Sequence, residues 1–148
     1  MFRIEYSADL EHATWLSSAI RGVASLWIED EGRLYDLELV VAEAANNAAE
    51  YSKGNPVVIL DKDGASLLIE VQSRGHRIGV DLDRASDCLN FDPEDVASVG
   101  ESGRGFFLLQ SLTEELSVTH REGVNIVRFR FALKAAESQA ESGPFSSS

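Results

Sequence analysis

The sequence is poor in cysteine, proline and methionine, with one, three and one of these residues in 148. The single cysteine, Cys88, excludes a disulfide within the chain and a zinc site made of cysteines, and it fits a reducing compartment. No apolar run approaches the ~20 residues of a membrane span, so we expect no membrane segment. The N-terminus also lacks the basic and apolar regions of a signal peptide. We therefore expect the protein in the cytoplasm.

Basic residues are scarce as well. The chain has 13 Lys and Arg against 25 Asp and Glu, which gives a formal net charge of −12 at pH 7. Nucleic-acid binding needs a basic stripe, so we expect no direct contact with nucleic acid. A polyphosphate ligand would have to be held locally, by backbone amides and a metal ion, against an unfavourable overall field. The three histidines, His12, His76 and His120, are too scattered for a metal site.

The composition that remains is that of an ordinary globular domain, with 44% hydrophobic and 26% charged residues. A chain of 148 residues is long enough for one domain with a two-layer core. Large apolar side chains become rare from residue 135 onward. We therefore predict a domain over residues 1–134 and a disordered tail over residues 135–148.

Residues 34–51 contain no glycine or proline and are rich in Ala, Leu and Glu, which are strong helix formers. Apolar residues recur at spacings of three and four and predict a buried helical face made of Leu34, Leu37, Val40, Val41, Ala44 and Ala48. Glu43 and Asn47 are four residues apart, so they lie one above the other at the edge of this face. This pair suits a general base and a metal ligand that line a pocket. On this segment alone, a solvated helix edge is the commoner interpretation.

The other segments predict one more long helix and several strands. The helix runs from about residue 10 to residue 28, and its buried stripe consists of Leu16, Ala19, Ile20, Val23, Leu26 and Trp27. Alternating segments predict a strand at 2–6, a hairpin of 57–60 and 66–72 with its turn at 61–64, and a hairpin of 116–119 and 124–132 with its turn at 121–123. Trp15 and Trp27 are expected to pack rather than to bind a ligand.

In the strand 66–72 and its continuation, alternation places Leu67, Ile69, Val71 and Ser73 on one face. The helices come early in the chain and most of the strands follow them. This order predicts an α+β fold, a two-layer sandwich with helices on one face of a mainly antiparallel mixed sheet.

A polar loop and a glycine-rich turn separate the two hairpins. Residues 81–100 are acidic and without pattern, and a long loop inside a compact domain is usually functional or disordered. Gly103 and Gly105 then lead directly into the apolar residues 106–112, which are predicted to be helical. Unpaired amides and the positive dipole end of a helix suit anion binding, and glycine allows a phosphate to approach the backbone. A plain helix start is the commoner meaning of such a turn.

Taken together and in order, these motifs resemble those of the GHKL (Bergerat-fold) ATPases. Within this superfamily the chain is similar to the anti-sigma-factor serine/threonine kinases of the RsbW and SpoIIAB type. Residues 43–48 resemble the N box, residues 71–75 stand where the first glycine box stands, and residues 103–112 resemble the second glycine box. The resemblance covers residues 2–132 and implies the Bergerat fold.

The resemblance also implies a function. Such a partner-switching regulator binds Mg-ATP, phosphorylates a serine on a STAS-domain anti-sigma antagonist, and otherwise sequesters a sigma factor or an equivalent partner. It implies that Glu43 is the general base and that Asn47 is a ligand of Mg²⁺. The residues expected to contact the nucleotide are Asn47, Ser73, Gly75, Gly103, Arg104, Gly105 and Phe106. Residues 81–100 would form a lid, and a homodimer is expected, with the first strand and first helix as interface elements.

One position departs from the family pattern. The family carries an aspartate in its first glycine box, which bonds the amino group of adenine, whereas this sequence has Ser73 there. A hydrogen bond to a charged group contributes ~1.5–3 kcal/mol and a neutral one ~0.5–1.5 kcal/mol. Loss of the charge is therefore expected to weaken nucleotide binding about tenfold.

Two hypotheses follow from these residues. The first is an ATP-dependent serine protein kinase that also acts as an anti-sigma factor. The second is a nucleotide-independent binding module on the same fold, which acts by sequestering a partner. Glu43 and Asn47 favour the kinase, because a pure binding module needs neither, whereas Ser73 favours the binding module.

Overall fold

The computed structural model describes residues 1–78 and 106–134. Its strands and helices, in chain order, are β1 (Phe2–Glu5), α1 (Leu10–Ala24), α2 (Glu31–Tyr51), β2 (Val57–Asp63), β3 (Ser66–Arg74), β4 (Glu114–Arg121) and β5 (Val124–Ala132). A further short helix spans residues 106–112, as predicted. The predicted lid at 81–100 and the predicted tail at 135–148 lie outside the described residues.

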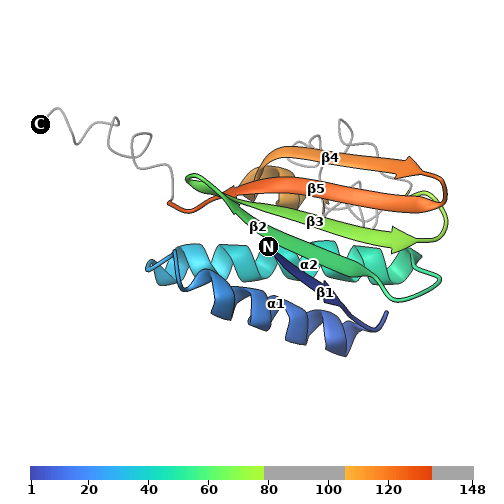
Figure 1. The fold of residues 1–148 in the computed structure, drawn as a ribbon, viewed down its shortest axis with the longest axis horizontal. Coiled ribbons are helices and arrows are strands. Elements are labelled where there is room, and N and C mark those ends of the chain that lie inside the picture. Colours follow the sequence, from blue (N-terminus) through green and yellow to red (C-terminus); the bar gives the residue numbers. More distant parts are fainter. Residues whose placement is uncertain (79–105, 135–148) are drawn as a thin grey trace, which may run out of the picture.

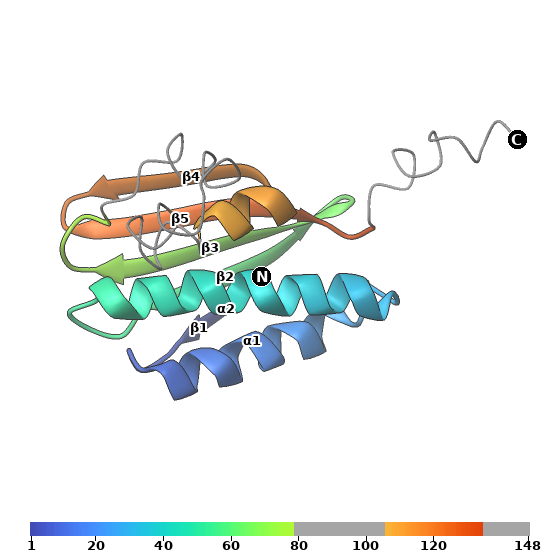
Figure 2. The ribbon, with the colours of Figure 1, turned by 180° about the vertical axis from the view of Figure 1, so that it is seen from behind.

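The strands form one sheet in the order β1-β2-β3-β5-β4 (Figure 1). Each of its pairings is antiparallel, and no parallel pair occurs among the strands that the structure describes. Figure 2 shows α1, α2 and the helix at 106–112 in front of the strands, so all three cover the same face. The predicted α+β sandwich with a mainly antiparallel sheet is confirmed.

The inner face of the sheet packs against α2. Along β3, Leu67, Ile69, Val71 and Ser73 are all buried, as their shared face requires. The predicted apolar face of α2 is buried along its whole length, at Leu34, Leu37, Val40, Val41, Ala44 and Ala48. These two rows join the inward side chains of β2 and β5 in one hydrophobic core. The spacing of apolar residues in the sequence therefore predicted correctly which side chains of α2 and β3 face inward.

The first helix is shorter than predicted. It begins at Leu10 because the carboxylate of Asp9 caps it, accepting a hydrogen bond of 2.8 Å from the amide of His12. It ends at Ala24, since the amides of Leu26 and Trp27 bond carbonyls only three residues back, which tightens the chain. The prediction that Ala19 and Leu26 are buried was wrong. Ala19 is on the exposed side of the helix, and Leu26 falls beyond the helix and is 73% exposed.

Three other predictions need correction. Helix α2 begins before residue 34, at Glu31, because the carboxylate of Asp30 caps it. Strand β2 continues through the predicted turn as far as Asp63 and leaves only residues 64 and 65 to reverse the chain. Trp15 does not pack in the core, since it is 57% exposed and makes an edge contact with His12. The turn of the second hairpin lies at residues 122 and 123, within the predicted range.

Candidate functional site

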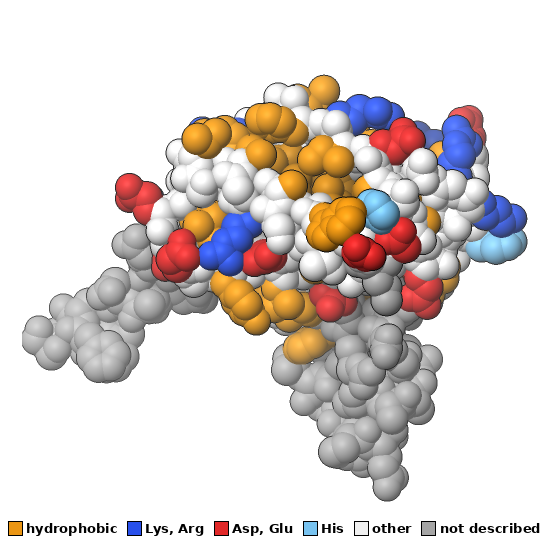
Figure 3. Space-filling model, turned by 90° about the horizontal axis from the view of Figure 1, so that it is seen from below, with side chains coloured by type: hydrophobic (Ala, Val, Ile, Leu, Met, Phe, Trp, Pro, Cys, Tyr) orange, Lys and Arg blue, Asp and Glu red, His pale blue; other side chains and the backbone are white. Residues whose placement is uncertain are grey.

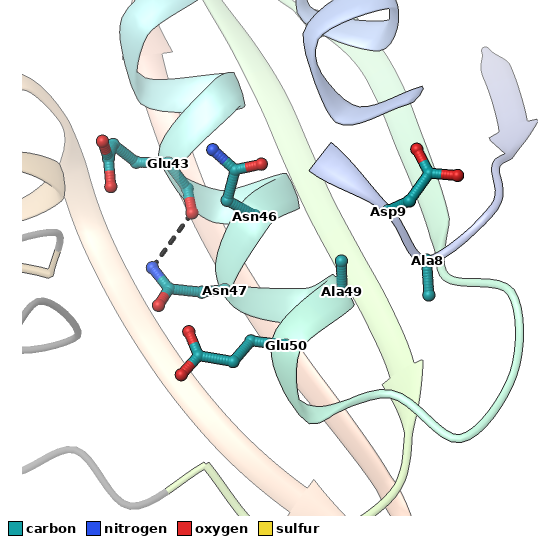
Figure 4. Close-up of a pocket in the computed structure, with 7 residues that line it drawn as sticks. All are labelled: Ala8, Asp9, Glu43, Asn46, Asn47, Ala49 and Glu50. Atoms are coloured by element: carbon teal, nitrogen blue, oxygen red, sulfur yellow. Dashed lines mark hydrogen bonds between the residues drawn. The ribbon is translucent and has the colours of Figure 1, made fainter. Parts of the chain in front are cut away.

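Polar side chains gather along the C-terminal half of α2, namely Glu43, Asn46, Asn47 and Glu50. Glu43, Asn47 and Glu50 are spaced by four and three residues and so share one side of the helix. All four line a cavity of about 550 Å³ together with Ala49 and two residues before α1, Ala8 and Asp9. Figure 4 shows Glu43, Asn47 and Glu50 on the same side of the helix, and Asn46 and Ala49 on another. The structure thus places the predicted pair, Glu43 and Asn47, in the wall of one cavity.

Asn47 is held in a defined orientation. Its side chain is only 5% exposed, and its amide nitrogen donates to the backbone carbonyl of Glu43 at 2.9 Å. Figure 4 shows the side-chain oxygen of Asn47 turned away from this bond. A fixed carbonyl oxygen is the kind of ligand that Mg²⁺ binds, so the orientation fits the predicted metal role.

The cavity is acidic. Asp9, Glu43 and Glu50 contribute carboxylates, and no basic residue lines the cavity within the described part of the chain. Hydrogen bonds from the backbone amide and side chain of His12 hold the pKa of Asp9 below its ordinary value. A cation would therefore favour the approach of a phosphate to these carboxylates.

The described residues do not build a complete metal cage. Residues 1–78 and 106–134 contain no group of three or more His, Cys, Asp or Glu side chains that could hold a metal ion. Mg²⁺ usually keeps several waters and binds through one or two protein oxygens plus substrate phosphates. The donor set around Asn47 thus fits a magnesium ion that arrives with a polyphosphate.

The end of β3 is fixed against the end of α2 by Gly75. This residue has φ 152°, and a Cβ at its position would lie 2.0 Å from the carbonyl oxygen of Tyr51. Ser52 forms a bridge with Gly75, and the amide of Lys53 donates to the carbonyl of Arg74 at 2.6 Å. Only glycine allows the two elements to meet so closely. The predicted Gly75 therefore joins β3 to the helix that carries Glu43 and Asn47.

Three buried polar atoms have no hydrogen-bond partner in the part of the chain that the structure describes. They are the side-chain oxygens of Asn46, Ser73 and Gln110. They belong to α2, the end of β3 and the helix at 106–112, which are the three segments predicted to form the nucleotide site. Buried polar groups without partners are rare in folded proteins and are explained by a functional role or a bound molecule. Each of these segments therefore carries a buried polar group that a ligand could bond.

The second glycine segment is only partly described. Gly103, Arg104 and Gly105 lie outside the described residues, and their roles stay predictions. Phe106 is fully buried at the start of the helix at 106–112, so its side chain belongs to the core. A contact of Phe106 with a nucleotide would have to come from its backbone amide.

The sequence reasoning did not find every residue of the cavity. Asn46 and Glu50 could have been predicted from the sequence, because their spacing from Glu43 places them near it on the helix surface. Asp9 had no such signal. It joins the cavity only because α1 packs beside α2, and the sequence showed it merely as a capping residue.

The family model for the histidine kinase-like ATPase domain matches residues 6–131. The chain belongs to this family. The match includes α2, β3 and the helix at 106–112, the elements that carry the three unpartnered polar atoms, and it confirms the predicted GHKL resemblance. No helix in the described part of this ATPase domain is long and apolar enough to cross a membrane.

The ATPase domain is also similar to a solved structure, the crystal structure of the SiaB–SiaC complex from Pseudomonas aeruginosa. The TM-score is 0.59 at 14% sequence identity, and the similarity covers 88% of this chain and 89% of that chain. At this identity the likeness shows a shared fold. No curated protein matches the sequence.

Proposed function

We propose that this ATPase domain binds Mg-ATP and transfers the γ-phosphate to a serine hydroxyl of a STAS-domain partner. The observation that carries the proposal is the placement of Glu43 beside an oriented Asn47 in the wall of one cavity. In the reaction, a bond forms between the serine oxygen and the γ-phosphorus, and the bond from phosphorus to the ADP oxygen breaks. Glu43 takes the hydroxyl proton through its carboxylate.

In the proposed complex Asn47 would hold a magnesium ion through its side-chain oxygen, and a bound ion would supply positive charge beside the phosphates. Gly103 and Gly105 contribute backbone amides, and Arg104 adds positive charge. Phosphoryl transfer depends mainly on positioning and on electrostatic stabilisation, which is the work these residues are suited to.

The proposal includes partner switching, in which the domain sequesters a sigma factor or an equivalent regulator when the STAS-domain antagonist is phosphorylated. Two findings support a regulator that works through protein partners. The motifs resemble those of anti-sigma-factor kinases, and the similar solved structure is a complex of two proteins.

The test compares three variants in calorimetric titration with Mg-ATP and in phosphotransfer to a STAS-domain protein from the same organism. Glu43→Gln should reduce phosphotransfer by about 10²–10⁴-fold and leave nucleotide affinity nearly unchanged, because a general base acts in the transition state. Asn47→Ala should weaken the binding of Mg-ATP itself. Glu50→Gln is the matched control, since Glu50 lines the same cavity about two turns further along α2. Equal rates in the Glu43→Gln and Glu50→Gln variants would overturn the assignment of the base.

Ser73 favours a second candidate, the nucleotide-independent binding module. The position offers a neutral hydroxyl that is 3% exposed, where the family pattern has a charged anchor. If the module acts without nucleotide, it should bind its protein partner equally well with and without Mg-ATP. It should also show no calorimetric response to ATP.

We also propose a homodimer formed through β1 and α1. Strand β1 is at the edge of the sheet, and a groove of about 310 Å³ runs between it and α1. Its apolar lining consists of Ile4 of β1, Tyr6 directly after β1, and Trp15, Leu16 and Ala19 of α1. Figure 3 looks toward α1 and shows apolar side chains gathered on this side of the molecule. An exposed edge next to an apolar groove is suited to pairing with a second copy.

The sequence of β1 is complementary to itself. If two copies pair antiparallel about Ile4, then Arg3 of one strand lies opposite Glu5 of the other, twice in the dimer. Arg3→Glu and Glu5→Arg should each weaken the dimer, and the double variant should restore it. Light scattering after gel filtration measures the outcome. A monomer at all concentrations, or a double variant weaker than both single ones, would contradict this interface.

A further inference from the structure

Basic side chains gather at the end of the sheet toward which the arrows of β3 and β4 point in Figure 1. They are Lys53, Arg74, Arg77 and Arg121, and we call this group the basic end. All four are exposed, and none takes part in an ion pair within residues 1–78 and 106–134. In a chain with a formal net charge of −12, such a group of cations is suited to an acidic ligand.

The strand register brings these side chains close together. Arg74 and Arg121 lie on either side of Val124, each paired with it, so their backbones are ~10 Å apart. Arg74 follows the buried Ser73 and therefore belongs to the outer face of the sheet, away from the helices. The amide of Lys53 donates to the carbonyl of Arg74, which places a third cation beside the two arginines.

The backbone that carries the basic end is held in place by hydrogen bonds. The amide of Gly75 donates to the carbonyl of Gly123 at 3.1 Å, and the ring Nε2 of His120 donates to the carbonyl of Gly75 at 3.2 Å. The buried carboxamide of Asn125 donates to the carbonyl of His76 at 2.7 Å. Binding to a backbone that is already fixed costs less conformational entropy, so the basic end is preorganised for a ligand.

A cavity of about 280 Å³ lies beside Arg74. Val57 of β2 and Val124 of β5 supply its apolar lining. Among the described residues Glu5 is its only carboxylate, and the side-chain amide of Asn55 already donates to Glu5 at 3.2 Å. The cavity can therefore receive an apolar side chain next to an arginine that has no ion pair within the described residues.

We propose that the basic end and this cavity together bind a short acidic segment of a partner protein, with one apolar residue among its carboxylates. The carboxylates pair with Arg74 and Arg121, and the apolar side chain enters the cavity beside Val124. A short segment fits because the basic end spans ~15 Å, three strand spacings from β4 to the chain after α2, which is about five residues of extended chain.

The charge of the whole chain favours a short acidic peptide over nucleic acid. A net charge of −12 repels a long polyanion, whereas a few carboxylates can approach the basic end alone. The inference goes beyond the proposed function and does not rest on it. Arg74 belongs to the outer face of the sheet, whereas Glu43 and Asn47 are on the helix that packs against the inner face.

Fluorescence anisotropy of the full chain with three labelled peptides tests the inference. The peptides are Glu-Glu-Leu-Glu-Glu, its variant with serine in place of leucine, and its variant with glutamine in place of each glutamate. The first should bind at least about tenfold more tightly than the glutamine peptide at low salt, and less tightly as salt is added, because salt screens exposed charges. It should also bind about three- to tenfold more tightly than the serine peptide, because the leucine side chain is buried in the cavity.

The variants separate the charges from the cavity. Arg74→Glu and Arg121→Glu should each weaken the binding of the first peptide about three- to tenfold, because each replaces an exposed ion pair with a repulsion. Val124→Ser should remove the preference for leucine over serine and leave the dependence on salt unchanged. Lys62→Glu is the matched control. Lys62 is exposed at the other end of the sheet and pairs with Leu67, ~23 Å along β3 from Arg74, so this change should leave the affinity unchanged.

Four outcomes would overturn the inference. Binding of none of the peptides would do so, and so would equal losses in Lys62→Glu and Arg74→Glu, since the peptide would then respond only to net charge. Displacement of the peptide by Mg-ATP would assign the arginines to the nucleotide site instead. Tighter binding of single-stranded DNA than of the first peptide would assign them to nucleic acid. A chain that binds the peptide as expected but fails to bind Mg-ATP would overturn the proposed kinase and leave this inference intact.

Discussion

Gly75 is the position at which the structure most strictly requires glycine. Replacing it with alanine would put a Cβ 2.0 Å from the carbonyl oxygen of Tyr51, so β3 and α2 would have to separate by about 1 Å. The backbone at φ 152° is also a conformation that alanine adopts only under strain, which costs ~1–3 kcal/mol. Gly75→Ala should therefore disturb both the local backbone and the junction.

The magnitude follows from what the separation would break. The bridge from Ser52 to Gly75 and the 2.6 Å bond from Lys53 to Arg74 cross this junction, and the 3.1 Å bond from Gly75 to Gly123 fixes the same residue to the turn between β4 and β5. Each such bond contributes ~0.5–1.5 kcal/mol. Partial loss of these bonds together with the backbone strain gives ~3–5 kcal/mol, a large share of the ~5–15 kcal/mol of a typical domain.

Gly64 offers a matched control for the backbone term. It also has a positive φ, 61°, but a Cβ there would meet nothing within 4 Å. Gly64→Ala should cost only ~1–2 kcal/mol, the usual penalty for a left-handed residue. Urea unfolding of both variants, with equal slopes, would measure the difference. If Gly75→Ala costs no more than Gly64→Ala, the close contact with α2 is not what requires glycine.

Three further predictions concern other parts of the fold. Tyr6→Phe removes the 3.0 Å bond from the Tyr6 hydroxyl to the Ala45 carbonyl and should lower the free energy of unfolding by ~0.5–1.5 kcal/mol. Burial raises the pKa of Tyr6 above 10.0, so the wild type should lose stability as the pH rises past 10.0, and the variant should lack this loss in unfolding series across that range. Hydrogen bonds from His12 lower the pKa of Asp9 below 3.8, so the stabilisation they give is present above pH 3.8 and is lost below it. Asp9→Ala should therefore destabilise the protein more at pH 7 than at pH 3, which unfolding curves at both pH values would measure. Arg33→Met should cost ~2 kcal/mol in thermal unfolding, because the guanidinium lies 3.8 Å over a phenylalanine of β5 and donates to a carbonyl at the end of that strand, whereas Arg33→Lys should cost less.

The fold was predictable where a local pattern decides it. The period of two along β3 and of three to four along α2 fixes which side chains face inward, and both faces appear as predicted. The start of α1 was predictable because Asp9 is a capping residue. The end of α1 was not predictable, because the apolar spacing continues past Ala24 whereas the backbone tightens there. Leu26 belongs to the apolar spacing and is nevertheless exposed.

The site was predictable only in part, for a physical reason. Glu43 and Asn47 lie next to each other because of helix geometry alone, and their spacing of four residues can be read from the sequence. Asp9 reaches the same cavity through the packing of α1 on α2, and no local pattern records that contact. Whether the Ser73 hydroxyl has a hydrogen-bond partner depends on Asn125, whose side chain accepts from the amide of Ile78, 47 residues away in the sequence. Only the structure shows that the serine hydroxyl has no partner within the described residues.

The three unpartnered oxygens link the site to the stability of the fold. Asn46, Ser73 and Gln110 come from three separate segments, and each buried oxygen without a partner costs ~1–3 kcal/mol. A ligand that bonds them offsets this cost only in the folded state, so binding and stability are coupled. Replacing these residues with apolar ones should accordingly stabilise the free protein while weakening ligand binding, the opposite of the effect at Gly75. The sign of the change in the free energy of unfolding therefore distinguishes residues that form the junction of β3 and α2 from residues whose polar groups would bond a ligand.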